Sequence, residues 1–271
     1  MTNQNAFNYA WKFIKNNWEL TVLTILVEIG FTILGFIPIV GVLFGLLLGL
    51  VVFNEQIYFG KAVIASRDNE EKIEDFSHKA KLEDFLFKYL GIAIGSYLAF
   101  LIIFIVIGAV FVGLSIASMG ESMYYMSNLN SLSGGNLDSL MASVYSWHAG
   151  ILELIIMLLL LIVIGMISYI YPAIMGEVIK SNSFGEAFQK TFWLFNVNFW
   201  KKSFNKRFFM FVFIWSLIVL GLVAMGGIWS VDKYFIPLGM FVFYFLGLYN
   251  GAVFVFASDL LEDENEAPKE N

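Results

Sequence analysis

Six long apolar windows dominate the pattern of hydrophobic and polar positions along the chain. They cover residues 20–37, 39–58, 89–115, 151–171, 208–228 and 236–257. An α-helix rises 1.5 Å per residue, so about 20 apolar residues are needed to cross the hydrocarbon of a bilayer. Backbone polar groups find no partner in hydrocarbon, and the windows lack the strict alternation of barrel strands. The pattern therefore predicts an all-α integral membrane bundle with six transmembrane helices.

Two pairs of these windows are joined by very short connections. Pro38 lies in the segment GFIPIVG between the first and second windows, and Pro237 lies in SVDKYFIPLG between the fifth and sixth. Proline does not continue a helix from its interior, so each segment marks the end of one helix and the start of the next. Both pairs are therefore predicted to form tight helical hairpins.

The segment before the first window has the periodicity of an amphipathic helix. Large apolar residues recur in residues 5–18 at spacings of four, three and four: Phe7, Trp11, Ile14 and Trp18. These spacings place them on one face of a helix, with Lys12 and Lys15 off that face. We expect this helix to lie in the membrane interface, with Trp11 and Trp18 as interfacial residues.

A similar segment precedes the fifth window. In residues 183–200 a helical face is built from five aromatic residues: Phe184, Phe188, Phe192, Phe195 and Phe199. Ser183 and Glu186 match a capping box, which predicts the start of the helix. Phe188, Phe192 and Trp200 are the expected interfacial residues. A weaker apolar face, made by Leu82, Phe85, Leu86 and Tyr89, precedes the third window.

These segments suggest that the chain repeats one arrangement three times. Each predicted unit is an in-plane helix followed by two spans, in residues 5–58, 75–171 and 183–257. The alternative is that aromatic interfacial helices recur in any multi-pass protein. Residues 1–258 are predicted to form a single polytopic domain, and the acidic residues 259–271 a disordered tail.

The positive charges indicate how the spans are oriented. Of the 16 Lys and Arg residues, all except Lys233 fall on one side of the predicted spans. Short basic loops stay in the cytoplasm, so both termini are expected inside a bacterial cytoplasmic membrane. The composition is also typical of a membrane protein, because 59% of the residues are hydrophobic and only 14% are charged. The net charge of the chain is −6. This balance predicts membrane lipids as partners and excludes a nucleic-acid surface.

Catalytic patterns are missing from the sequence. His78 and His148 fall on opposite sides of the predicted membrane, so they cannot share a site. Phosphate-binding glycine loops, nucleophile elbows and zinc-binding helix motifs do not occur, and without cysteine there is no thiolate chemistry. We therefore expect a non-enzymatic protein with no cofactor and no metal.

Polar side chains within the spans are the candidate site residues. They are Glu28, Asn54, Glu55 and Asn250. An ionisable side chain in the membrane costs about 2.5–3.5 kcal/mol on insertion scales unless it has a partner. One interpretation makes Glu28 a proton or cation site with Asn250 or Asn54 as its hydrogen-bonding partner. The other makes it a protonated carboxyl that ties helices together.

Rows of glycine at four-residue spacing mark candidate helix contacts. They are Gly41, Gly45 and Gly49 in the second window, Gly91 and Gly95 in the third, and Gly247 and Gly251 in the sixth. Small residues let helix backbones approach closely in membranes. We expect these faces to pack within the chain, with oligomerisation through the same faces as the alternative.

The run YPAIMGEVIKSNSFGEAFQKTFWLFNVNFW resembles a pattern in bacterial inner-membrane proteins. In that pattern a span ends in a proline, a short segment leads to a small capping residue and an E-A-F/L helix, and a further hydrophobic pair follows. The run resembles YciC-like membrane proteins and the membrane domain of some glycerophosphodiester phosphodiesterases. The residues that carry the likeness are Pro172, Glu177, Ser183, Glu186, Ala187, Phe188 and Trp200. The resemblance implies a polytopic inner-membrane protein, and it does not carry over phosphodiesterase activity.

Two functions are therefore expected from the sequence. The first is a non-enzymatic membrane protein whose interfacial helices bind lipid headgroups or a partner, the alternatives being a membrane-protein partner or a homo-oligomer. The second is a small-solute or proton-coupled transporter with Glu28 as its coupling residue.

Overall fold

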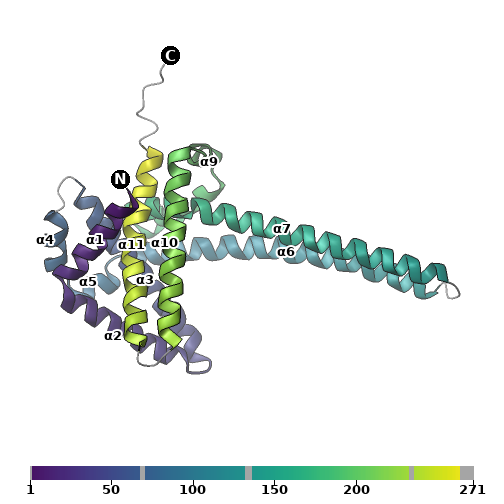
Figure 1. Ribbon diagram of the computed structural model, residues 1–271, viewed down its shortest axis with the longest axis horizontal. Coiled ribbons are helices and arrows are strands. Elements are labelled where there is room, and N and C mark those ends of the chain that lie inside the picture. Colours follow the sequence, from purple (N-terminus) through teal and green to yellow (C-terminus); the bar gives the residue numbers. More distant parts are fainter. Residues whose placement is uncertain (1, 68–70, 132–135, 232–234, 263–271) are drawn as a thin grey trace, which may run out of the picture. The chain divides into compact units, whose positions relative to one another are not determined.

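The computed structural model describes residues 2–67, 71–131, 136–231 and 235–262, with residues 71, 118–131, 136–150 and 231 described by their backbone alone. All regular elements in these ranges are helical (Figure 1). They are α1 (Asn3–Asn16), α2 (Trp18–Gly35), α3 (Val40–Ala65), α4 (Glu71–Lys79), α5 (Leu82–Phe87), α6 (Leu90–Ser131), α7 (Asn136–Lys180), α8 (Phe184–Thr191), η1 (Phe192–Phe195), α9 (Val197–Ser203), α10 (Lys206–Val231) and α11 (Ile236–Glu262).

Six of these helical segments are long and apolar enough to cross a membrane. They are Trp18–Gly35, Val40–Ala65, Leu82–Ala117, Ile151–Lys180, Lys206–Ser230 and Ile236–Glu262. The predicted six-span, all-α membrane bundle is therefore confirmed, and the chain is a multi-pass membrane protein. The apolar windows located the spans because a bilayer demands the same length and composition from every crossing helix.

The described helices fall into two compact units. One contains residues 1–99 and 170–271, and the other is the helical pair of residues 100–169. Along the chain, one or more short helices precede each of three pairs of long helices, and an interfacial position for the short ones stays a prediction. A common origin of the three copies stays a prediction, and so does their assembly into a single domain of residues 1–258.

A tight turn joins α2 to α3. Ile39 has a φ of 71°, a conformation that β-branched residues rarely adopt, and Pro38 precedes it. Gly41 lies directly against the turn, since a Cβ there would collide with the carbonyl oxygen of Gly35. Gly41 therefore allows the hairpin to close, so its role is in the turn between two consecutive spans.

The α1 helix is buried along a face that shares only Ile14 with the apolar face predicted from the spacing. Its buried face is formed by Asn3, Ala6, Tyr9, Ala10, Phe13 and Ile14. Phe7 and Trp11 are exposed, as is Trp18 at the start of α2. The Tyr249 hydroxyl on α11 donates to Asn3 Oδ1 at 2.8 Å, and Asn3 Nδ2 donates to the Phe211 carbonyl at 3.1 Å. These bonds fix the start of α1 to α10 and α11.

The expected helix of residues 183–200 is broken into three pieces, namely α8, η1 and α9. Asn196 separates the last two, because its side chain accepts hydrogen bonds from the backbone N–H groups of Asn198 and Phe199 and so starts a new helix. The start of α8 agrees with the predicted capping box. Ser183 Oγ accepts from the Glu186 N–H at 3.3 Å, although the Glu186 carboxylate accepts from Asn182 rather than from Ser183.

The charge of Glu186 is stabilised where α8 begins. The backbone N–H of Asn182 and the ammonium group of Lys190, which lies 3.1 Å away, lower the pKa of the Glu186 carboxyl. A carboxylate in the first turn also interacts favourably with the helix dipole.

The sequence prediction was wrong about the ends of two helices, α7 and α11. The α7 helix does not end at Pro172 but continues through it to Lys180. Prolines are tolerated in membrane helices because surrounding groups satisfy the freed carbonyl. The α11 helix extends to Glu262, so residues 259–262 of the predicted tail are helical and Asp259 is buried. Residues 263–271 lie outside the described residues.

The core of the larger unit is centred on α11. In its most apolar stretch 72% of the residues are buried, against 28% or less in each of the other five spans. Close helix approach depends on three glycines there. A Cβ at Gly251 would lie 2.6 Å from the Gln56 carbonyl oxygen, one at Gly60 would lie 2.8 Å from Ile179, and one at Gly176 would collide with the Phe254 carbonyl.

Only some of the predicted glycine contacts are present. Gly95 lies against the Phe184 carbonyl and Gly251 against α3. Among the described residues, nothing lies within 4 Å of the Cβ position at the other predicted contact glycines, which are Gly45, Gly49, Gly91 and Gly247. Among the described residues, the four-residue spacing therefore marked a close approach at Gly95 and Gly251 but not at these four positions, although Gly247 is buried in α11.

Candidate functional site

Two carboxyl groups from neighbouring spans meet in the core of the larger unit. Glu28 on α2 and Glu55 on α3 are 4% and 3% exposed, and their side chains are in hydrogen-bonding contact. A hydrogen bond between two carboxyl groups requires a proton on one of them. The partner of Glu28 is therefore a second acid.

Hydroxyl groups surround this pair. Thr21 and Thr24 precede Glu28 by seven and four residues, so the three side chains share one face of α2. Both threonines are fully buried. The Tyr244 ring of α11 is 2% exposed, and its hydroxyl lies near Thr21 and within the electrostatic reach of both carboxyls.

Several oxygen atoms of this cluster have no hydrogen-bond partner. Among the described residues, Thr24 Oγ1, Glu55 Oε1 and the Tyr244 hydroxyl are buried without a bond of normal geometry. Leaving a buried polar atom unpaired costs about 1–3 kcal/mol. Glu55 Oε1 belongs to the pair itself, Thr24 lies on the same face of α2 as Glu28, and Tyr244 lies beside Thr21, so the unpaired polar atoms here are all oxygens.

The arrangement suits a proton or a small monovalent cation. Oxygen ligands favour hard cations, and the two carboxylates provide the negative charge. The described residues contain no group of three or more His, Asp and Glu side chains placed to hold a metal ion. The cluster therefore has the composition of a light-cation site rather than of a transition-metal centre.

Asn54 and Asn250 do not contact Glu28. Asn54 Nδ2 donates to the Phe85 carbonyl at 2.6 Å, and its Oδ1 accepts from the Tyr89 N–H at 2.8 Å. Asn54 therefore fixes α3 to the junction of α5 and α6. Asn250 accepts a hydrogen bond of 2.9 Å from Trp215 Nε1, which joins α11 to α10. The sequence identified both as buried polar residues, but their roles are in helix packing.

The sequence held a signal for part of this cluster. Thr21, Thr24 and Glu28 follow helical spacing, and that pattern could have identified a polar stripe on the first span. Tyr244 gave no comparable signal, because it lies in a window rich in aromatic residues. Its proximity to the carboxyls depends on how α11 packs against α2 and α3.

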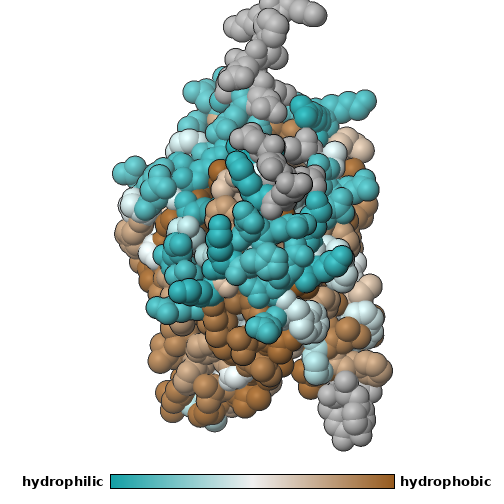
Figure 2. Space-filling model, turned by 90° about the vertical axis from the view of Figure 1, so that its left-hand side faces the viewer, coloured by the Kyte–Doolittle hydropathy of each residue, from teal (hydrophilic) through white to brown (hydrophobic). Residues whose placement is uncertain are grey.

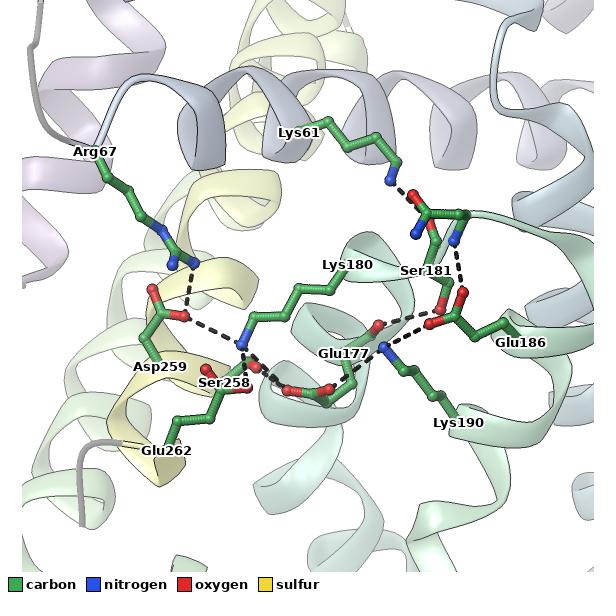
Figure 3. Close-up of polar contacts among 11 residues, drawn as sticks. Lys61, Arg67, Glu177, Lys180, Ser181, Glu186, Lys190, Ser258, Asp259 and Glu262 are labelled. Carbon is green, nitrogen blue, oxygen red and sulfur yellow. Dashed lines mark hydrogen bonds and ion pairs between the residues drawn. The ribbon is translucent and has the colours of Figure 1, made fainter. Parts of the chain in front are cut away.

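A second polar cluster joins the ends of α3, α7, α8 and α11 (Figure 3). Lys180 Nζ lies 3.2 Å from Glu177, 3.2 Å from Asp259 and 2.8 Å from Glu262. Arg67 pairs with the same Asp259 at 2.6 Å. The Ser258 hydroxyl donates to Glu177. Lys180 therefore connects α7 with α11, and Arg67, which follows α3, is joined to them through Asp259.

The network extends toward α8. Lys190 contacts both Glu177, at 3.6 Å, and Glu186, at 3.1 Å. Lys61 Nζ donates to the Ser181 carbonyl at 2.7 Å (Figure 3). Each acid in this network has at least one cationic partner, so it is electrostatically satisfied and its role is to hold helix ends together.

The predicted interfacial residues differ in exposure. Trp11 and Trp18 are 50% and 58% exposed. Phe188 and Phe192 are partly exposed and contact each other with ring centroids 5.2 Å apart. Trp200 Nε1 donates to the Leu194 carbonyl at 2.7 Å, so this indole also holds η1 and α9 together.

The fold and this site define an all-α, multi-pass membrane protein with a buried carboxyl pair. Comparison with protein-family models, with curated proteins and with solved structures finds no match for this chain.

Proposed function

We propose that the chain is a membrane carrier that binds a proton or a small monovalent cation at Glu28 and Glu55. The observation that carries this proposal is the contact of two buried carboxyls from adjacent spans, one of which keeps an oxygen, Glu55 Oε1, without a hydrogen-bond partner. Ionisable groups within membrane spans mark ion and proton pathways in many transporters. The supporting argument is chemical, because no cation among the described residues pairs with these two acids, whereas each acid of the Lys180 network has a cationic partner.

Occupancy of this site would change the contacts between helices. With a shared proton or a bound cation, Glu28 and Glu55 attract each other, and without one the two carboxylates repel. A ligand shifts a conformational equilibrium when it binds one state better than the other. The bound ion would therefore favour the arrangement in which α2, α3 and α11 are closed around the pair.

The proposal predicts loss of an infrared signal in two variants of the purified, reconstituted protein. Stepping the pH should change the carbonyl stretch of protonated carboxyls in the unaltered chain. Glu28→Gln and Glu55→Gln should lose this change, because an amide cannot take up the proton yet still donates a hydrogen bond. Glu153→Gln is the matched control, since Glu153 is an exposed acid of α7.

Transport is tested in the same vesicles by proton or Na⁺ flux under an imposed membrane potential. Flux should fall to the level of protein-free vesicles in Glu28→Gln and Glu55→Gln and persist in Glu153→Gln. An infrared change without flux in the unaltered chain would overturn the carrier proposal and leave a structural carboxyl pair. Equal flux in all three variants would overturn it as well.

We further propose that both termini lie in the cytoplasm of a bacterium and that the protein belongs to its inner membrane. The support is the confinement of Lys and Arg to one side of the spans. The chain has no cysteine, so a single cysteine at Ser133 should react with a membrane-impermeant reagent added outside, whereas one at Lys206 should not. Labelling of both positions from the same side would contradict this orientation.

A second candidate function is a non-enzymatic accessory role in the membrane, in which the protein binds lipid or a partner protein. The exposed aromatic residues of the interfacial helices favour it, above all Trp11, Trp18, Phe184 and Phe195. The resemblance to YciC-like membrane proteins supports this role, because it implies a polytopic inner-membrane protein and does not carry over phosphodiesterase activity.

A further inference from the structure

A pocket lined by three lysines lies between α3, α4 and α5. Its volume is about 410 Å³. Lys72 and Lys79 come from α4, and Lys88 follows α5. The aromatic side chains of Tyr58 and Phe76 also line the pocket. It shares no residue with the carboxyl pair or with the ion-pair network, so neither of these explains it.

The positive and negative side chains that line this pocket are unequal in number. Asp75 and Asp84 also line it. In the part of the chain that the structure describes, none of the pocket's three lysines forms an ion pair, whereas Lys180 and Lys190 are both paired. Three ammonium groups and two carboxylates leave a formal charge of +1 within the pocket. An anion with one negative charge would balance it.

The pocket lies at the level where a span begins. Lys88 Nζ is 5.9 Å from the ring centroids of both Tyr58 and Tyr89, so cation–π contact holds this ammonium group beside the start of α6. Tyrosines are enriched where membrane helices pass from hydrocarbon to the headgroup region. The lysines therefore surround a position that a lipid phosphate group can reach.

Apolar surface adjoins the same helices. Phe76 on α4 and Phe87 on α5 are 37% and 51% exposed. Figure 2 shows the side of the molecule on which α4 and α5 lie, with hydrophilic residues over its upper part and hydrophobic residues below. A free phosphate compound would use only the charged part of such a surface, whereas a phospholipid would use both.

We propose that this pocket binds the headgroup of an anionic phospholipid whose phosphodiester carries a single negative charge. Lys72, Lys79 and Lys88 surround the phosphate, and Tyr58 forms part of the wall beside it. Asp75 and Asp84 limit the charge that the pocket accepts, which disfavours multiply charged anions. The inference does not depend on ion transport, because the carboxyl pair is a separate site.

The test is native mass spectrometry of the full chain in detergent, titrated with phosphatidylglycerol and, separately, with phosphatidylcholine. A triple variant, Lys72→Gln with Lys79→Gln and Lys88→Gln, should bind phosphatidylglycerol roughly 100-fold more weakly, since each basic side chain near an anionic headgroup contributes several-fold. The matched control is Lys201→Gln with Lys202→Gln and Lys206→Gln, which removes the same charge near α9 and should change the affinity less than about twofold.

Further arms separate the remaining alternatives. The pair Asp75→Asn and Asp84→Asn should strengthen phosphatidylglycerol binding, and a weaker affinity would overturn the assignment of an anionic lipid. Displacement of the lipid by inorganic phosphate at low millimolar concentration would point to a free phosphate ligand and overturn it too. Equal losses in the triple variant and its control would mean general attraction rather than a site. Unchanged thermal unfolding of the triple variant would show that lost binding is not lost folding.

Discussion

Lys180→Met is expected to lower the free energy of unfolding by about 1–3 kcal/mol, because it removes one of the two cations that contact each of two buried acids. Lys190 stays beside Glu177, and Arg67 stays beside Asp259. The Glu177 and Asp259 side chains are only 7% and 10% exposed, and both lie 3.2 Å from Lys180 Nζ. Methionine keeps the length and apolar stem of lysine, so the change removes the charge and little packing. Thermal unfolding in detergent, followed by the fluorescence of the seven tryptophans, measures the effect.

Two further variants test the cause of this loss. Lys201→Met removes an exposed lysine that has no ion pair among the described residues, and it should change stability by less than about 0.5 kcal/mol. Adding Asp259→Asn to Lys180→Met should recover part of the stability, since it removes one of the acids that lose a cation. If Lys180→Met unfolds at the temperature of the unaltered chain, the network does not hold these helix ends together.

Gly176→Val should destabilise the contact between α7 and α11 by about 3 kcal/mol or more. A Cβ at Gly176 would collide with the Phe254 carbonyl and with the Ser258 side chain, and the carbonyl belongs to the rigid backbone of a buried helix. The helices would have to separate, and Glu177 would move with α7 away from Ser258. A lower unfolding temperature, together with proteolytic sensitivity of α11, is the expected observation.

Gly49→Ala is the matched control for this prediction. Among the described residues nothing lies within 4 Å of the Cβ position at Gly49, and the residue is exposed on α3. Alanine should raise stability there by up to about 1 kcal/mol, because it favours the helix over the unfolded chain. Comparable losses at both glycines would contradict the close approach of α7 to α11, since the two substitutions would then act only through the helix backbone.

Local patterns predicted much of the secondary structure. The apolar windows located six spans, Pro38 marked a hairpin, and the capping residue Ser183 marked the start of α8. Each of these features depends on residues within a few turns of one another. Pro172 was misplaced as a helix end, because the cost of a proline depends on the groups that surround it.

The candidate site was only half predictable. Glu28 was identified from its position in an apolar span, because burial of an acid is unfavourable without a partner. Its partner was not identified, since the sequence led us to expect Asn250 or Asn54, and not Glu55, as the hydrogen-bonding partner. Glu55 meets Glu28 because it points from α3 toward α2, while Asn54, one residue earlier, points toward α5. Adjacent residues on a helix differ by about 100° in direction.

The sequence by itself determined that this protein crosses a membrane six times and which helix faces are aromatic, because length, composition and helical period act within single segments. Only the tertiary structure decided which faces meet. It brought Tyr244 to the carboxyl pair, placed Asp259 in an ion-pair network rather than in a tail, and gave Gly95 and Gly251 a close backbone contact that Gly45 and Gly49 lack. Contacts between distant helices depend on how whole surfaces fit together, and no single segment carries that information.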